Sequence, residues 1–108
     1  MDPMRRVVIV GDGGWGTALS MVLVCNGREV GLWSYDPEYA DLMRETRTNP
    51  RFLPGFDIPE AVEISADLDA LLPGAELLVS AVPTTYVREV WTVHLGRLRP
   101  ELPFLSVS

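Results

Sequence analysis

The chain has 108 residues, of which 47% are hydrophobic and 22% are charged, and it carries a formal net charge of −6. This composition is typical of one globular domain, and the nine positive side chains, all of them arginines, are too scattered for a nucleic-acid surface. No apolar run approaches the ~20 residues of a membrane span or forms a signal peptide, so we expect a cytoplasmic protein.

A glycine-rich loop joins the first two predicted elements. The apolar run Arg6–Val10 predicts a buried strand. The segment Trp15–Cys25 predicts a helix, with apolar side chains at helical spacing on one face (Trp15, Ala18, Leu19 and Val22). Between them, Gly11, Gly13 and Gly16 form the pattern G-x-G-x-x-G, in the strand–turn–helix context that a dinucleotide site requires.

Each of these glycines has a predicted role. Gly11 allows the tight turn out of the strand, Gly13 lets a pyrophosphate approach the backbone, and Gly16 lets the helix pack closely on the sheet. The first N–H groups of the helix, together with its dipole, would then stabilise the phosphate charge. The loop therefore predicts nucleotide binding. The alternative is a tight turn that needs glycines and binds nothing.

The rest of the chain continues to alternate between strands and helices. The further predicted strands are Glu29–Trp33, Val62–Ile64, Leu77–Ala81 and Pro103–Val107. The further predicted helices run from Asp36-Pro37 to about Arg47, over Ala66–Leu72 and over Thr85–Leu98. The segment Thr48–Glu60 is predicted to be a loop, because its prolines exclude a helix and most strand pairing.

This alternation of apolar strands with helices predicts an α/β fold. We expect a Rossmann-type, doubly wound parallel sheet in the strand order 3-2-1-4-5, with both faces covered. In that order the first and fourth strands are neighbours, and a crevice opens at their carboxyl ends. The loops Gly11–Gly16 and Val82–Thr84 both lie on this crevice, so two features point to one place.

Charges near the end of the second strand bear on the choice of cofactor. An acidic residue there often binds the adenosine ribose, but here the strand ends in Trp33-Ser34-Tyr35. Asp36 follows late and is better interpreted as a helix cap, so the choice between NAD and NADP stays open. Asp12 places a charge near the predicted pyrophosphate. We expect it to weaken dinucleotide binding, unless it points into solvent or pairs with an arginine.

Three further features of the sequence bear on function. The segment Asn49–Gly55 is either a structural loop or a wall of the nucleotide site, with Phe52 against a ring or ribose. The single histidine, His94, is interpreted as a surface residue, and the lone Cys25 as a small buried hydrophobe. No cluster of cysteines and histidines predicts a metal site and no nucleophile triad is present, so no catalytic residue is assigned.

Several segments together are more specific than the glycine pattern. They are Gly11–Leu19 with its W-G-T-A-L run, Asn26–Val30, Leu32-Trp33, Asn49–Gly55 with its L-P-G run, and Ala81–Pro83. With these segments the chain resembles, over nearly its whole length, the N-terminal domain of NAD(P)-dependent glycerol-3-phosphate dehydrogenase of the bacterial type. This family joins a Rossmann-type domain to a helical domain and interconverts dihydroxyacetone phosphate and glycerol 3-phosphate by hydride transfer.

The resemblance implies that residues 1–108 are an NAD(P)-binding domain that stops at the fifth strand, without the helical substrate domain. Besides the three glycines, it implies cofactor contacts from Gly14, Trp15, Tyr35, Phe52 and Pro83. The family usually has serine at position 14.

The family's catalytic lysines lie beyond residue 108, and this chain contains no lysine. We therefore expect residues 1–108 to bind NAD or NADP without catalysing a reaction, to need the substrate domain as a partner, and to form homo-oligomers at high concentration. The alternative is a stand-alone nucleotide-binding or interaction module without catalysis.

Overall fold

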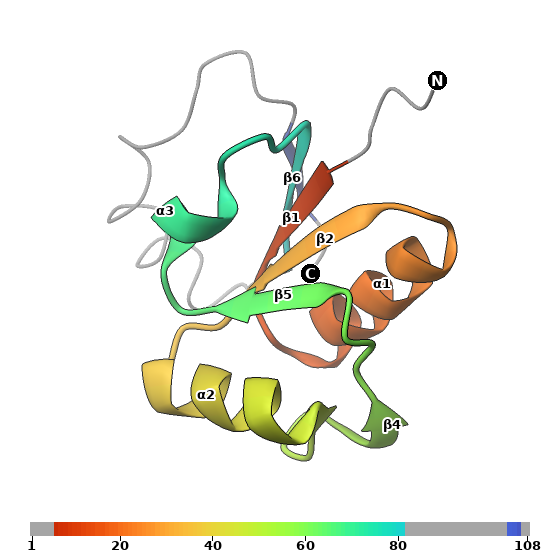
Figure 1. The fold of residues 1–108 in the computed structure, drawn as a ribbon, viewed down its shortest axis with the longest axis vertical. Helices are drawn as coiled ribbons and strands as arrows, with labels where there is room; N and C mark the ends of the chain where they lie inside the picture. The colour runs from red at the N-terminus through yellow and green to blue at the C-terminus, as the bar shows by residue number, and fades with distance from the viewer. Residues whose placement is uncertain (1–5, 82–103, 107–108) are drawn as a thin grey trace.

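Five parallel strands form the central sheet of the computed structural model, which describes residues 6–81 and 104–106 (Figure 1). Along the sheet the order is β5-β2-β1-β6-β7. The bounds are β1 (Arg6–Val10), β2 (Glu29–Trp33), β5 (Val62–Ser65), β6 (Leu77–Ser80) and β7 (Phe104–Ser106). The predicted order 3-2-1-4-5 is therefore confirmed.

Side chains of β1, β2 and β6 enter two apolar clusters, one on each face of the sheet. Val7 and Ile9 belong to one cluster, which packs against α1 (Gly14–Cys25) and α2 (Pro37–Thr46). Val8 and Val10 belong to the other, which packs against α3 (Leu68–Leu71). Figure 1 shows α1 and α3 on opposite sides of the sheet, so the expectation of a sheet covered on both faces is confirmed. The predicted helix Thr85–Leu98 lies outside the described residues.

The side of α1 that faces the sheet agrees only in part with the apolar face seen in the sequence, because Leu19 packs against the core but Trp15 and Val22 do not. Trp15 is 78% exposed and Val22 is 54% exposed, whereas Gly16, Thr17 and Ser20 are buried. Small residues take the inner side near the start of α1, because the helix there approaches its own loop closely, as the surroundings of Gly16 show below. Further along the helix, Leu19 and Leu23 pack against the core. The exposed Cys25 at the end of the helix also corrects the expectation of a buried thiol.

Local capping explains where α2 begins and ends. The Asp36 carboxylate accepts a hydrogen bond from the N–H of Glu38 at 3.0 Å, and Pro37 occupies the first helical position. Arg47 ends the helix in the left-handed conformation, with φ 54°. The interpretation of Asp36 as a helix cap is confirmed.

A small antiparallel pair replaces the loop predicted for Thr48–Glu60. Here β3 (Thr48–Asn49) pairs with β4 (Leu53–Asp57), with an irregularity in the register between Thr48 and Asn49. The prediction of a loop was wrong because it treated proline as a barrier to pairing. In a two-stranded pair every strand is an edge, so Pro54 can sit where no N–H is needed.

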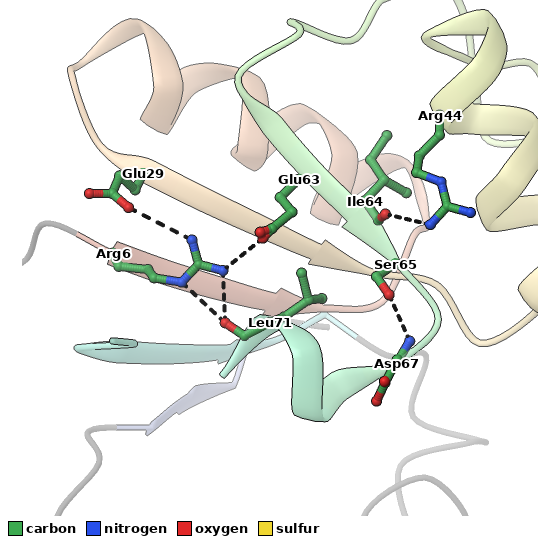
Figure 2. Close-up of polar contacts among 8 residues, drawn as sticks. All are labelled: Arg6, Glu29, Arg44, Glu63, Ile64, Ser65, Asp67 and Leu71. Carbon is green, nitrogen blue, oxygen red and sulfur yellow. Dashed lines mark hydrogen bonds and ion pairs between the residues drawn. The ribbon is translucent and has the colours of Figure 1, made fainter. Parts of the chain in front are cut away.

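At the amino end of β1, the Arg6 side chain contacts three other elements, α3, β5 and β2 (Figure 2). Its Nε and Nη2 donate to the carbonyl oxygen of Leu71, at the end of α3, at 3.1 and 2.8 Å. The same guanidinium lies 3.3 Å from Glu63 on β5 and 3.8 Å from Glu29 on β2. At Gly31 a Cβ would lie 3.3 Å from Nη2 of Arg6, so the glycine gives this side chain its room.

None of the helices in residues 6–81 and 104–106 has both the length and the hydropathy to cross a membrane. The longest of those helices, α1, has 12 residues. In the same part of the chain, no three His, Cys, Asp or Glu side chains gather as metal ligands.

Candidate functional site

The glycine loop connects the carboxyl end of β1 to the first turn of α1. Gly11 has φ 123°, a conformation that favours glycine, and its N–H donates to the carbonyl oxygen of Trp33 at 3.0 Å. At Gly16 a Cβ would lie only 2.3 Å from the carbonyl oxygen of Gly11 and 3.3 Å from Cβ of Ala81. At Gly13, by contrast, a Cβ would meet nothing within 4 Å. The tight turn at Gly11 and the close packing at Gly16 are confirmed, and Gly13 faces open space.

The first turn of α1 has no capping side chain. Asp36 and Asp67 cap α2 and α3, whereas the N-cap of α1 is Gly13, and its first turn contains no acidic residue. Its first N–H groups are therefore left for an acceptor from outside the helix, at the positive end of the helix dipole. Beside this turn lies an open hollow of about 360 Å³ lined by Gly14, Trp15 and Ala18.

The segment from Asn49 to Gly55 packs directly against the glycine loop. A Cβ at Gly14 would lie 3.0 Å from the carbonyl oxygen of Phe52, so the missing side chain at Gly14 allows this approach. The Phe52 side chain is 47% exposed, and its ring meets the ring of Tyr39 edge to face at 6.5 Å. The segment therefore has a structural role and also stands beside the first turn of α1.

Asn49 connects this segment to the glycine loop from a fully buried position, with 1% of its surface exposed. Its side-chain nitrogen donates to the backbone oxygen of Asp12 at 2.7 Å and to Oγ1 of Thr17 at 2.8 Å. Its side-chain oxygen accepts from the Tyr39 hydroxyl and from the N–H of Phe52. The sequence places Asn49 in a motif but does not predict that it bonds this segment to the glycine loop. The one available signal was a polar residue at the start of the run Asn49–Gly55.

Two polar residues follow β2 directly. Ser34 is fully buried, and its hydroxyl donates to Oδ2 of Asp12 at 2.7 Å. Tyr35 is 64% exposed, and its ring lies edge to face with Trp33 at 6.0 Å. The Asp12 carboxylate thus neither stands free in solvent nor pairs with any arginine of the described segments, which were the two arrangements considered from the sequence.

Backbone bonds align the strand ends at one edge of the sheet. The N–H of Gly11 meets the end of β2 at Trp33, and the N–H of Ala81 donates to the carbonyl oxygen of Val10 at 2.8 Å. The structure therefore brings the glycine loop, Tyr35 and the start of the loop after β6 to the same edge. Pro83 and His94 lie outside the described residues.

Comparison with known proteins agrees with this architecture. A family profile described as NAD-dependent glycerol-3-phosphate dehydrogenase N-terminus matches residues 6–108. A glycerol-3-phosphate dehydrogenase (NAD(P)+) of Bacillus velezensis is 38% identical over 105 residues, which cover 97% of this chain and 30% of the relative. The corresponding protein of Geobacillus thermodenitrificans is 45% identical over 87 residues, or 81% of this chain and 25% of the relative.

A crystal structure of glycerol-3-phosphate dehydrogenase from Coxiella burnetii superposes with a TM-score of 0.87 and 33% identity, over 94% of this chain and 31% of that one. The chain thus spans about 30% of the length of the curated relatives it matches. Because the family profile covers almost the whole sequence, the chain belongs to the NAD-dependent glycerol-3-phosphate dehydrogenase family and corresponds to its N-terminal part.

Proposed function

We propose that residues 1–108 form the NAD(P)-binding domain of a glycerol-3-phosphate dehydrogenase. The observation that carries this proposal is the first turn of α1, which has no capping side chain and begins at Gly13, where a Cβ would meet nothing within 4 Å. Such a turn is the arrangement that pyrophosphate binding needs, since free N–H groups and the helix dipole both favour an anion. The names of the curated relatives support the same class of cofactor.

In this proposal each predicted site residue has a defined part. Gly13, Gly14 and Trp15 offer their backbone to the pyrophosphate, while Gly11 and Gly16 hold the loop in shape. Tyr35 and Phe52, which are 64% and 47% exposed, would flank the bound nucleotide from the end of β2 and from the segment that packs against Gly14. Pro83 is proposed to contact the ribose next to the nicotinamide, as its place in the family motif implies.

A bound nicotinamide dinucleotide supplies a hydride donor or acceptor. We propose that the reaction it serves is the interconversion of dihydroxyacetone phosphate and glycerol 3-phosphate. No lysine occurs among residues 1–108, and the chain matches only about 30% of its relatives' length. The part played by these residues is therefore to bind and orient the cofactor, and catalysis requires further sequence.

The binding site is tested by calorimetry with NADH and NADPH on the wild-type protein and on the Gly13→Val variant. Valine at position 13 has room within the protein but occupies the space in front of the backbone, so we expect a folded variant that binds neither cofactor. Thermal unfolding supplies the control for folding, and Gly13→Ala supplies a smaller step in the same direction. Unchanged affinity in a folded Gly13→Val variant would overturn the proposed site.

An activity assay tests whether residues 1–108 bind the cofactor without catalysing the reaction. Residues 1–108 alone are expected to leave NADH unoxidised in the presence of dihydroxyacetone phosphate. Turnover above a control without protein would contradict the absence of catalytic residues from this part of the chain.

A further inference from the structure

The side chain of Asp12 is held at a defined place next to the predicted nucleotide site. Its Oδ2 accepts a hydrogen bond from the buried Ser34 hydroxyl at 2.7 Å. Its backbone oxygen accepts from Asn49 at 2.7 Å and from the Thr17 hydroxyl at 3.2 Å. Because both ends of the residue are bonded, the carboxylate is fixed beside Ser34, the first residue after β2.

This place is where doubly wound dinucleotide-binding sheets usually carry an acidic residue. A carboxylate at the end of the second strand accepts hydrogen bonds from the adenosine ribose, and proteins that use NADP replace it or add an arginine. In this chain β2 runs directly into Ser34 and Tyr35, which carry no charge. Asp36 follows, but its Oδ1 caps α2 through the N–H of Glu38.

We propose that Asp12 is the residue that selects NAD(H) over NADP(H), with its carboxylate reaching the end of β2 from the glycine loop instead of from β2 itself. This inference rests on the proposed cofactor site. Oδ1 of Asp12 has no hydrogen-bond partner among residues 6–81 and 104–106, so it is available to a ribose hydroxyl. A phosphate on the 2′-oxygen removes that donor and brings about −1.5 to −2 charges at pH 7 towards the carboxylate.

The cations of the described segments do not offset this charge. None of their arginines forms an ion pair with Asp12. Arg51, the arginine of the segment that packs on the glycine loop, instead lies over the Tyr39 ring, 4.2 Å from its centre. A 2′-phosphate would therefore meet a carboxylate that no arginine of the described segments pairs with, and the repulsion would act on NADP(H) far more than on NAD(H).

The direct test compares the dissociation constants of NADH and NADPH by calorimetry. The measurement uses the purified protein at its natural length. The wild type is expected to bind NADH about tenfold more tightly than NADPH, or better, because like charges brought together at a binding site are strongly unfavourable. In Asp12→Asn, which keeps the shape and removes the charge, the two dissociation constants should come within about threefold of each other. This smaller difference should come mainly from a lower dissociation constant for NADPH.

A matched control is Asp36→Asn. It removes the other carboxylate near the end of β2 and keeps the cap, since asparagine caps helices as well as aspartate does. The NADH-to-NADPH ratio should not change in this variant. If Asp36→Asn narrows the ratio and Asp12→Asn does not, the selecting residue is Asp36 and the inference is overturned.

A second measurement needs no variant. Raising the ionic strength screens repulsion between exposed charges, so the wild-type preference for NADH should narrow between about 0.01 and 1 M salt. Equal affinity for both cofactors at low salt, or a preference for NADPH, would overturn the inference while leaving the cofactor site in place. Binding of neither cofactor would overturn the proposed function as well, so the two failures are distinguishable.

Discussion

The side-chain nitrogen of Asn49 donates to the backbone oxygen of Asp12 at 2.7 Å across 37 positions of sequence. The same nitrogen also reaches Oγ1 of Thr17 at 2.8 Å, so one buried amide joins the β3–β4 pair to both the glycine loop and α1. The segment around Phe52 is thereby held against Gly14. The shape of the candidate site thus depends on a residue that need not touch a ligand.

The first prediction is that Asn49→Asp lowers the free energy of unfolding by about 2–3 kcal/mol. The new carboxylate accepts hydrogen bonds but cannot donate to Asp12 or Thr17, and it buries a charge. Urea denaturation measures the loss. The same substitution at the exposed Asn26 is the control and should cost no more than about 1 kcal/mol, from its place at the end of α1. Equal effects at the two positions would show that Asn49 has no special role.

The second prediction is that alanine costs much more stability at Gly16 than at Gly13, although both glycines belong to one loop. Gly16→Ala places a Cβ 2.3 Å from the Gly11 oxygen, a backbone atom that cannot yield cheaply. We expect a loss of about 3 kcal/mol or more in stability, at or beyond the usual range for overpacking. Gly13→Ala, whose Cβ meets nothing within 4 Å, should unfold at nearly the wild-type temperature. Thermal melts followed by circular dichroism compare them, and a stable Gly16→Ala would argue against the close packing.

The third prediction concerns which partner of Arg6, the Leu71 carbonyl or the Glu63 carboxylate, contributes more to stability. Arg6→Leu leaves the Leu71 oxygen without its two donors and should cost about 1–3 kcal/mol. The Glu63 side chain is 50% exposed, so Glu63→Gln should cost less than about 1 kcal/mol. Denaturant titrations at low and high salt measure both losses. A larger loss for Glu63→Gln than for Arg6→Leu would mean that the ion pair, and not the carbonyl contact, stabilises this corner.

The fourth prediction tests the cap of α2. Asp36→Ala removes the acceptor of the Glu38 N–H and should lower stability by about 1 kcal/mol. Asp36→Asn retains an acceptor in the same place and should match the wild type. If the two variants lose the same amount in a chemical denaturation series, the charge of Asp36 and not its hydrogen bond stabilises the helix.

Much of the fold follows from patterns that act over a few residues. The bounds predicted for β1 and β2 agree with the structure because each strand is a short apolar run closed by turn residues. Asp36 and Pro37 mark the start of α2 because capping involves only neighbouring backbone groups. The strand order followed from the alternation of strands and helices together with the handedness of their crossovers. The glycine loop was predictable for the same reason, since its pattern and context lie within one strand–turn–helix unit.

The tertiary structure alone decided which distant residues meet. Asp12 and Ser34 are 22 positions apart, and they come together only because β1 and β2 end side by side in the parallel sheet. The inner face of α1 also depended on packing: the closeness of Gly11 to Gly16 requires small residues there and leaves Trp15 outside. Hydrophobic periodicity reports which side chains are apolar, but the sheet determines how closely a helix can approach it. Local patterns therefore determined the strands and helices of the central sheet and the glycine loop, whereas long-range packing determined the β3–β4 pair and how the site is assembled.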